Sequence, residues 1–295
     1  MFKLKGIYAP IPTPFVDAHG PIAFDKLESN MAFWNDSDLT GVVVMGSNGE
    51  FVVLDWQEKC ELIDKACEYA KDKKSVIAGC GCESTRDTIK MCEHAAKAGA
   101  DAALVLSPNY YKRAMTDAIN KNFYIEVADA SPIPVILYNM PGNSGINLTS
   151  SLVSSLASHP NIIGVKDSGG NIVQISEIIR DTPDDFAVFA GSASFLFHTL
   201  AVGGVGGTLA LANIFPNECA KLQTLVEQGN MEDAAELQLK ILESNTAVTA
   251  RWGIAGLKAA MEIVGLYGGT PRKPLMPLGA EERKQLTSIL EKLKG

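Results

Sequence analysis

The chain has 295 residues, of which 46% are hydrophobic and 20% charged, and its formal net charge is -8. This composition suits a globular protein with a sizeable core, and the negative charge argues against nucleic acid or an anionic membrane as the main partner. Pro10 interrupts the amino-terminal segment before an apolar helix could form, so we expect neither a signal nor a transit peptide. No stretch approaches the roughly 20 apolar residues of a membrane span. The six cysteines form no CxxC pair, which favours reduced thiols in a cytoplasmic protein.

Eight short apolar segments are expected to form β-strands. They cover residues 6–11, 41–45, 75–79, 102–106, 134–138, 162–166, 186–190 and 205–209. Amphipathic helical patterns follow at residues 55–70, 84–98, 116–128, 149–158, 171–180 and 193–201. Apolar strands that alternate with helices indicate a parallel sheet covered by helices. Eight such units in about 225 residues predict an α/β fold of the closed (β/α)8 TIM barrel type, with an open doubly wound sheet as the alternative.

The pattern changes after Pro216, where only helical segments remain. They cover residues 217–228, 231–245, 254–264 and 280–294. The first of these helices suits the eighth helix of the barrel. We therefore predict a catalytic barrel domain over residues 1–228 and a C-terminal helical bundle over residues 229–295, packed on the barrel. The sequence contains no low-complexity tract or long linker between the two.

Lys166 is the first candidate for chemistry, because catalytic groups of such barrels lie at the C-terminal ends of strands. It closes the apolar segment Ile162–Ile163–Gly164–Val165, where an unpaired lysine is costly. Gly164 lies on the same face of the strand and leaves room beside the lysine. Desolvation favours the free amine that Schiff-base chemistry requires. The structural alternative is a strand-end lysine that pairs with Asp167 or reaches solvent.

Three further strand ends carry polar residues. Tyr138 ends the preceding strand, next to Lys166 on the barrel rim, where a phenol can relay a proton. Ser47 and Asn48 lie between two glycines after the second strand, in a loop that could hold a carboxylate or be a simple turn. Tyr110 follows the fourth strand with a second tyrosine, and packing is the plainer interpretation of that pair.

Other chemistries have weaker support in the sequence. The four histidines are not spaced as a metal site, and neither a nucleophile elbow nor a P-loop is present. The glycine-rich segment at residues 203–207 lies where barrels often bind phosphate, but glycines there also relieve crowding. We favour the steric explanation.

The ordered motifs resemble the dihydrodipicolinate synthase and N-acetylneuraminate lyase superfamily over nearly the whole chain. They are PTPF at residues 12–15, GSNGE at 46–50, YNMP at 138–141 and GVKDS at 164–168. The resemblance implies a (β/α)8 barrel with a C-terminal helical extension, assembled as a homotetramer that is a dimer of dimers. By position, Lys166 would form the Schiff base and Tyr138 would relay protons. Ser47 and Asn48 would hold the pyruvate carboxylate, and Tyr110 would complete the relay in a neighbouring subunit.

The loop after the fifth strand departs from the synthase pattern. Synthases usually carry an arginine two residues after the YNxP motif, where this chain has Asn143, and Thr-Thr where it has Ser47 and Asn48. The chain is more similar to 4-hydroxy-2-oxoglutarate aldolase, which shares GSNGEF, HPNIIGVKDSGG at residues 159–170 and NTAVTARWGIAGLK at residues 245–258. That resemblance implies cleavage of 4-hydroxy-2-oxoglutarate to pyruvate and glyoxylate.

The expected activity is thus that of a class I carbon–carbon lyase acting on a small 2-oxo acid. Lys166 supplies the electron sink, so we expect no metal and no organic cofactor. Ser168, and Asn143 by its position, are expected to contact the second product. Three alternatives stay open: a dihydrodipicolinate synthase, a sugar-acid or N-acetylneuraminate-type aldolase, and a non-catalytic barrel that binds 2-oxo acids.

Overall fold

Eight parallel strands form a closed barrel in the computed structural model, which describes residues 2–71 and 73–294. Each strand pairs with its sequence neighbour, and β8 pairs with β1, so the predicted (β/α)8 fold is confirmed and the open sheet is not found. The strands are β1 (Gly6–Pro10), β2 (Gly41–Val44), β3 (Ser75–Gly79), β4 (Ala102–Leu106), β5 (Val135–Asn139), β6 (Ile162–Asp167), β7 (Ala187–Ala190) and β8 (Gly206–Thr208).

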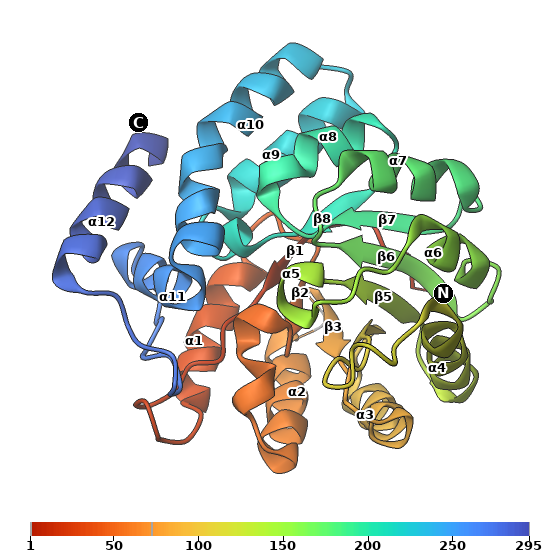
Figure 1. The fold of residues 1–295 in the computed structure, drawn as a ribbon. Coiled ribbons are helices and arrows are strands. Elements are labelled where there is room, and N and C mark those ends of the chain that lie inside the picture. Colours follow the sequence, from red (N-terminus) through yellow and green to blue (C-terminus); the bar gives the residue numbers. More distant parts are fainter. Residues whose placement is uncertain (1, 72, 295) are drawn as a thin grey trace.

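Helices surround the strands (Figure 1). They are α1 (Phe24–Asn35), α2 (Trp56–Ala70), α3 (Thr85–Ala98), α4 (Asp117–Ala130), α6 (Ser150–Leu156), α7 (Ile172–Asp181), α8 (Leu196–Ala201) and α9 (Pro216–Glu227). Their ends follow ordinary capping rules. The Ser84 side chain accepts a hydrogen bond from the Asp87 amide at the start of α3, and Gly99 ends that helix with φ +95°.

Helix α1 was not anticipated from the sequence. Its N-cap residue, Ala23, offers no side-chain hydrogen bond, so the usual start signal is absent. Its buried stripe contains Leu27, Met31 and Trp34 but also Asn30, which breaks the apolar pattern. Asn30 is buried because it exchanges two hydrogen bonds with the backbone of Tyr267, a contact that only the tertiary structure reveals.

Short helical turns follow several strands on the side where the strands end. They are η1 (Ser47–Gly49) and η2 (Phe51–Val53) after β2, α5 (Pro141–Ser144) after β5, η3 (Ala193–Phe195) after β7 and η4 (Ala210–Asn213) after β8. The helix expected over residues 193–201 is divided between η3 and α8, since the chain bends at Phe195 (φ -134°, ψ 19°).

The chain ends in α10 (Met231–Thr246), the π-helical turn η5 (Ala247–Arg251), α11 (Gly253–Ile263) and α12 (Ala280–Lys294). Figure 1 shows α11 and α12 to one side of the ring of helices. Helix α10 contacts α9 and η3, while α12 contacts α10 and α11. The boundary at residue 228 stays a prediction. Within the described part of the chain, no helix has the length and apolar character needed to cross a membrane.

The hydrophobic core has two parts, one inside the barrel and one between the strands and the surrounding helices. Alternate strand residues point inward, and Tyr8, Val43, Leu104, Ile136 and Phe189 belong to the inner cluster. The other strand residues join the larger cluster between strands and helices. The inner layer nearest the strand ends contains polar residues, and it positions the candidate site.

The Arg272–Glu58 pair joins the segment after α11 to the start of α2. Both guanidinium nitrogens of Arg272 lie 2.7 Å from the Glu58 carboxylate, and this hydrogen bonding lowers the pKa of Glu58. A lowered folded-state pKa contributes stability above the ordinary glutamate range and loses it as the pH falls through the folded-state value.

We therefore predict that Glu58→Gln lowers the free energy of unfolding by about 1 kcal/mol at neutral pH, since the pair is partly solvated. The difference from the wild-type protein should shrink towards zero as the pH falls below about 4. Denaturant unfolding at several pH values measures it. The matched control is Glu281→Gln, whose exposed pair with Lys284 spans 3.8 Å. A loss of stability that does not depend on pH would contradict the assignment.

Candidate active site

Lys166 occupies the inner face of β6, close to the end of that strand. Its side chain is only 4% exposed, and Gly164 precedes it on the same face. The pairing register places Tyr138 of β5 on one side of it and Phe189 of β7 on the other. Among residues 2–71 and 73–294, no side chain forms an ion pair with Lys166. The structure thus presents a buried lysine that is neither paired with Asp167 nor extended into solvent.

Tyr138 lies directly beside the lysine. The Lys166 Nζ is 4.2 Å from the centroid of the Tyr138 ring, a cation–π distance for a charged lysine. The Tyr138 hydroxyl lies 3.0 Å from Ser47 Oγ, so these two groups share a hydrogen bond. Three of the predicted site residues are therefore brought together from β5, β6 and the loop after β2.

The loop after β2 turns sharply at both ends. Met45 has φ +58° and Glu50 has φ +56°, conformations that are rare for residues other than glycine. Between them, η1 holds Ser47 and the half-buried Asn48. The backbone closes on itself, since the Gly49 amide donates to Gly46 O over 2.9 Å. This tight turn presents the two polar residues of the motif at the barrel mouth.

Asp167 organises the loop that follows the lysine. Its carboxylate accepts hydrogen bonds from the amides of Gly169 and Gly170, at 2.9 and 3.1 Å, and from the Asn139 side chain at 2.7 Å. Asn139 also accepts from the Leu148 amide over 2.9 Å. Both Asp167 and Asn139 are 1% exposed. The hydrogen bonds of the Asp167 carboxylate therefore hold together the loops that follow β5 and β6.

Ser168 and Asn143 lie on these two loops. The Ser168 amide donates to Asn139 O over 2.8 Å, and its side chain faces Gly191 after β7. A Cβ on Gly191 would lie 2.0 Å from Ser168 Oγ, so only glycine allows this approach. Asn143 is exposed on α5. The single chain therefore places Asn143 in solvent at this rim.

Tyr110 lies on the loop between β4 and α4 and is 78% exposed. Its ring meets Tyr111 edge-on at a centroid distance of 5.0 Å. The Tyr110 amide and that of Asn109 donate to the Glu83 carboxylate, which fixes this part of the loop. Tyr110 does not join the Ser47–Tyr138 hydrogen bond within one chain. Its expected role in a neighbouring subunit stays a prediction.

Several residues that shape the site were not predicted from the sequence. Asn139 stands within the YNMP motif without a predicted role, and Asp167 of the GVKDS motif was considered only as an ion-pair partner of Lys166. Glu50 and Lys258 form an ion pair with an Nζ–Oε1 distance of 2.6 Å and are 2% and 1% exposed. A lysine within the apolar helical segment 253–263 was the available signal, since buried charges require partners.

Comparison with known proteins identifies the family of the chain. A model described as the dihydrodipicolinate synthetase family matches residues 3–293. The chain belongs to this family. Members of the dihydrodipicolinate synthetase family are lyases and aldolases of the class I type, and the chain is an enzyme of that kind.

Three relatives illustrate the range of the family. A probable mitochondrial 4-hydroxy-2-oxoglutarate aldolase from Emericella nidulans is 37% identical, over 96% of this chain and 93% of its own length. A 4-hydroxy-tetrahydrodipicolinate synthase from Geotalea uraniireducens is 35% identical, over 97% and 98%. The crystal structure of YagE, a prophage protein of this family from E. coli K12 in complex with pyruvate, is 29% identical with a TM-score of 0.92 and covers 99% of both chains. The family therefore includes proteins named for both reactions.

Removal of the Asp167 carboxylate should destabilise the protein. Asp167→Ala removes the acceptor of the buried Asn139 side chain and of the Gly169 and Gly170 amides, and water can replace it only at the glycines, which are not buried. We expect the free energy of unfolding to fall by about 1–3 kcal/mol, the cost of one unsatisfied buried group, measured by urea denaturation. The control Asp129→Ala removes an exposed carboxylate bound to His159 and should change it little. Equal effects of the two substitutions would refute this role.

Proposed function

We propose that this enzyme is a Schiff-base-forming, pyruvate-dependent aldolase that cleaves 4-hydroxy-2-oxoglutarate to pyruvate and glyoxylate. The observation that carries the proposal is the buried, unpaired Lys166 with its Nζ 4.2 Å from the Tyr138 ring, whose hydroxyl bonds to Ser47. A buried amine, a phenol and a small polar loop are the groups that iminium chemistry on a 2-oxo acid requires.

The reaction begins with attack of the free amine of Lys166 on the C2 ketone. Loss of water gives an iminium that accepts the electron pair of the breaking C3–C4 bond. The C4 hydroxyl loses its proton through Tyr138, and glyoxylate leaves. The resulting enamine is protonated at C3, and water then hydrolyses the iminium, releasing pyruvate and restoring Lys166.

Ser47 and Asn48 are proposed to hold the C1 carboxylate during these steps. The loop lies against Tyr138, so a carboxylate bound there would place the neighbouring C2 carbon near the lysine. Fixing one end of the substrate converts binding energy into orientation of the reacting atoms. The pyruvate complex of the related E. coli protein supports pyruvate as the ligand.

The identity of the second product rests on two features. The 37% identical fungal relative is named a probable 4-hydroxy-2-oxoglutarate aldolase, and Asn143 stands where synthases usually carry an arginine. The synthase activity, which condenses pyruvate with aspartate semialdehyde, is the second candidate because a 35% identical relative is named a synthase. Ser168 and Asn143 are proposed to face the second product. The homotetramer and the cytoplasmic location stay predictions.

Borohydride reduction in the presence of pyruvate tests the covalent step. We predict a stable pyruvate adduct, located at Lys166 by peptide mass spectrometry, because reduction traps the iminium. Lys166→Ala should abolish both the adduct and turnover while the protein stays folded. Lys284→Ala, at an exposed lysine of α12, serves as the control and should leave both the adduct and turnover unchanged. A folded protein that binds pyruvate without an adduct would instead be the non-catalytic 2-oxo-acid-binding barrel.

Loss of the Tyr138 hydroxyl should slow proton transfer. We predict that Tyr138→Phe lowers kcat for 4-hydroxy-2-oxoglutarate about 10²–10⁴-fold, the usual contribution of a positioned acid–base group. Tyr111→Phe, on an exposed ring, is the matched control. An unchanged kcat in Tyr138→Phe would remove this tyrosine from the mechanism.

A substrate panel separates the candidate second substrates. Purified enzyme is assayed with pyruvate plus glyoxylate, pyruvate plus aspartate semialdehyde, and longer 2-oxo sugar acids. We predict the highest kcat/KM with glyoxylate, or with 4-hydroxy-2-oxoglutarate in the cleavage direction. A higher kcat/KM with aspartate semialdehyde would assign the synthase reaction instead, and preference for a longer acid would assign a sugar-acid aldolase.

A further inference from the structure

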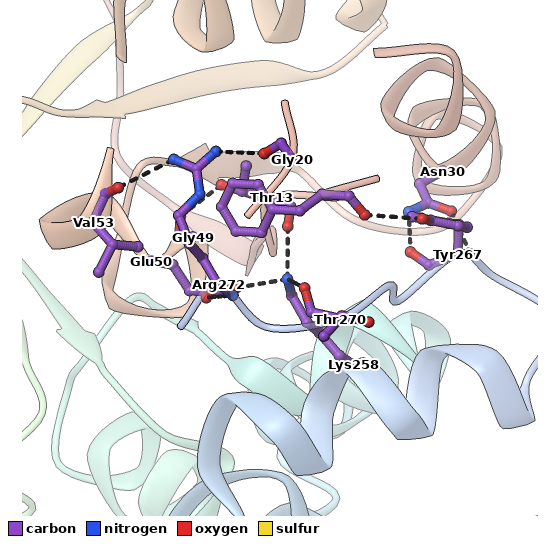
Figure 2. Close-up of polar contacts among 11 residues, drawn as sticks. Thr13, Gly20, Asn30, Gly49, Glu50, Val53, Lys258, Tyr267, Thr270 and Arg272 are labelled. Carbon is purple, nitrogen blue, oxygen red and sulfur yellow. Dashed lines mark hydrogen bonds and ion pairs between the residues drawn. The ribbon is translucent and has the colours of Figure 1, made fainter. Parts of the chain in front are cut away.

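Glu50 and Lys258 form a buried ion pair between the loop after β2 and helix α11. The Lys258 Nζ lies 2.6 Å from Glu50 Oε1, and the side chains are 1% and 0% exposed, respectively. Lys258 also donates to the backbone carbonyls of Thr13 and Thr270, over 2.9 and 3.2 Å. Figure 2 shows the ammonium among these partners. Residues separated by about 200 positions in the sequence thus share one charged contact.

The pair acts directly on the turn that carries Ser47 and Asn48. Glu50 follows η1 immediately and has φ +56°, a conformation that the surrounding structure must hold in place. Its second oxygen accepts a hydrogen bond from the Arg272 amide over 2.8 Å. Both carboxylate oxygens are therefore bound by the segment 258–272. Residues of the C-terminal extension therefore hold Glu50, the left-handed residue that ends the turn.

Thr13 provides a second connection between Lys258 and this turn. Its carbonyl accepts from the Lys258 Nζ, while its hydroxyl donates to the carbonyl of Gly49 (Figure 2). Lys258 thus contacts the turn through Glu50 and, one hydrogen bond removed, through Thr13 and Gly49. The Phe15 ring closes the site, with Lys258 Nζ at 4.6 Å and the Arg272 guanidinium at 4.1 Å from its centroid.

Stability alone is a poor explanation for this pair. Replacing a buried ion pair with apolar residues of similar volume is often neutral or stabilising, because burial removes both charges from water. Burial lowers the pKa of Lys258 although the Glu50 carboxylate opposes that shift. What an apolar pair would not supply is the directional contact that holds Glu50 in its left-handed conformation.

We propose that Glu50 and Lys258 are a positioning pair that fixes the Ser47–Asn48 turn for the carboxylate of pyruvate. The inference rests on the proposed function, because it assumes that this turn binds that carboxylate. Neither residue contacts the reacting atoms. Their loss should weaken pyruvate binding and leave the chemistry of Lys166 intact once pyruvate is bound.

The experiment measures how adduct formation depends on pyruvate concentration. Wild-type enzyme, Glu50→Gln, Lys258→Met and the double variant are treated with borohydride over a pyruvate series, and thermal unfolding is recorded for each. We expect the half-saturating pyruvate concentration to rise about tenfold or more in all three variants. The adduct yield at saturating pyruvate should match the wild-type yield.

The double variant separates positioning from folding. It leaves no unpaired buried charge, so its melting temperature should recover relative to the single variants while its half-saturating concentration stays high. Leu290→Ala is the control for lost stability, since this buried leucine of α12 makes no polar contact with the turn. It should lower the melting temperature without changing the half-saturating concentration.

Thr13→Val keeps every buried charge paired and tests the second connection even where the charge variants fail to fold. It should raise the half-saturating concentration about threefold or more. Wild-type half-saturation in Thr13→Val, or in a folded double variant, would overturn the proposal. If the wild-type enzyme forms no adduct, the proposed function itself fails, and the two failures are thereby distinguished.

Discussion

The register of the closed parallel barrel is the constraint on which the candidate site depends. Because side chains alternate along each strand, the pairing of Tyr138 with Lys166 fixes both residues on the inner face and in one layer. A shift of one residue would turn the lysine towards the helices and leave Val165 in its place. The neighbouring pairings, Leu106 with Tyr138 and Lys166 with Phe189, complete that layer with apolar side chains. They keep the lysine out of solvent. The room expected beside Gly164 is filled, because a Cβ there would lie 2.4 Å from the Ala187 carbonyl oxygen and 3.1 Å from the Leu4 side chain. The strand register that closes the barrel therefore also determines which side chains surround the Lys166 amine.

The C-terminal extension adds a second constraint, on the loops above that layer. Helix α11 reaches the loop after β2 through Lys258, and α10 reaches the loop after β7. There Gln238 donates to Ala193 O over 2.8 Å and accepts from the Phe197 amide over 3.0 Å. Asn245 donates to the hydroxyls of two serines of this loop, at 2.9 and 2.8 Å. Loops are ordinarily the mobile part of a barrel. In this enzyme, two of them are held by buried polar contacts from helices outside the eightfold repeat.

Much of this arrangement was accessible from the sequence, and the omissions have physical causes. Strand and helix periodicity predicted the barrel, and a lysine closing an apolar strand identified Lys166 because unpaired charge is costly there. Adjacent strand ends then placed Tyr138 beside it. Helix α1 escaped notice because Asn30 interrupts its stripe, and its partner lies 237 residues away. Lys258 escaped notice for the same reason: its partner is distant in sequence, so the pattern shows a lysine on a helix but not the carboxylate that it meets. Polar pairs between residues that are distant in the sequence do not show up in its hydrophobic periodicity.

The two halves of the substrate site differ in how firmly the chain determines them. The half proposed for pyruvate is built from strand ends and from a turn that buried polar contacts hold in place, including those from the C-terminal extension. The half proposed for the second product lies on loops: Asn143 is exposed on the short α5, and Tyr110 is 78% exposed beside Tyr111. Both side chains are exposed, so substituting them should disturb the buried barrel residues little. Relatives that are 35–37% identical over nearly the whole chain bear names of different reactions, and the proposed division of the site offers a reason. In the proposed function, one covalent half serves several acceptors, and the exposed residues of these loops select among them.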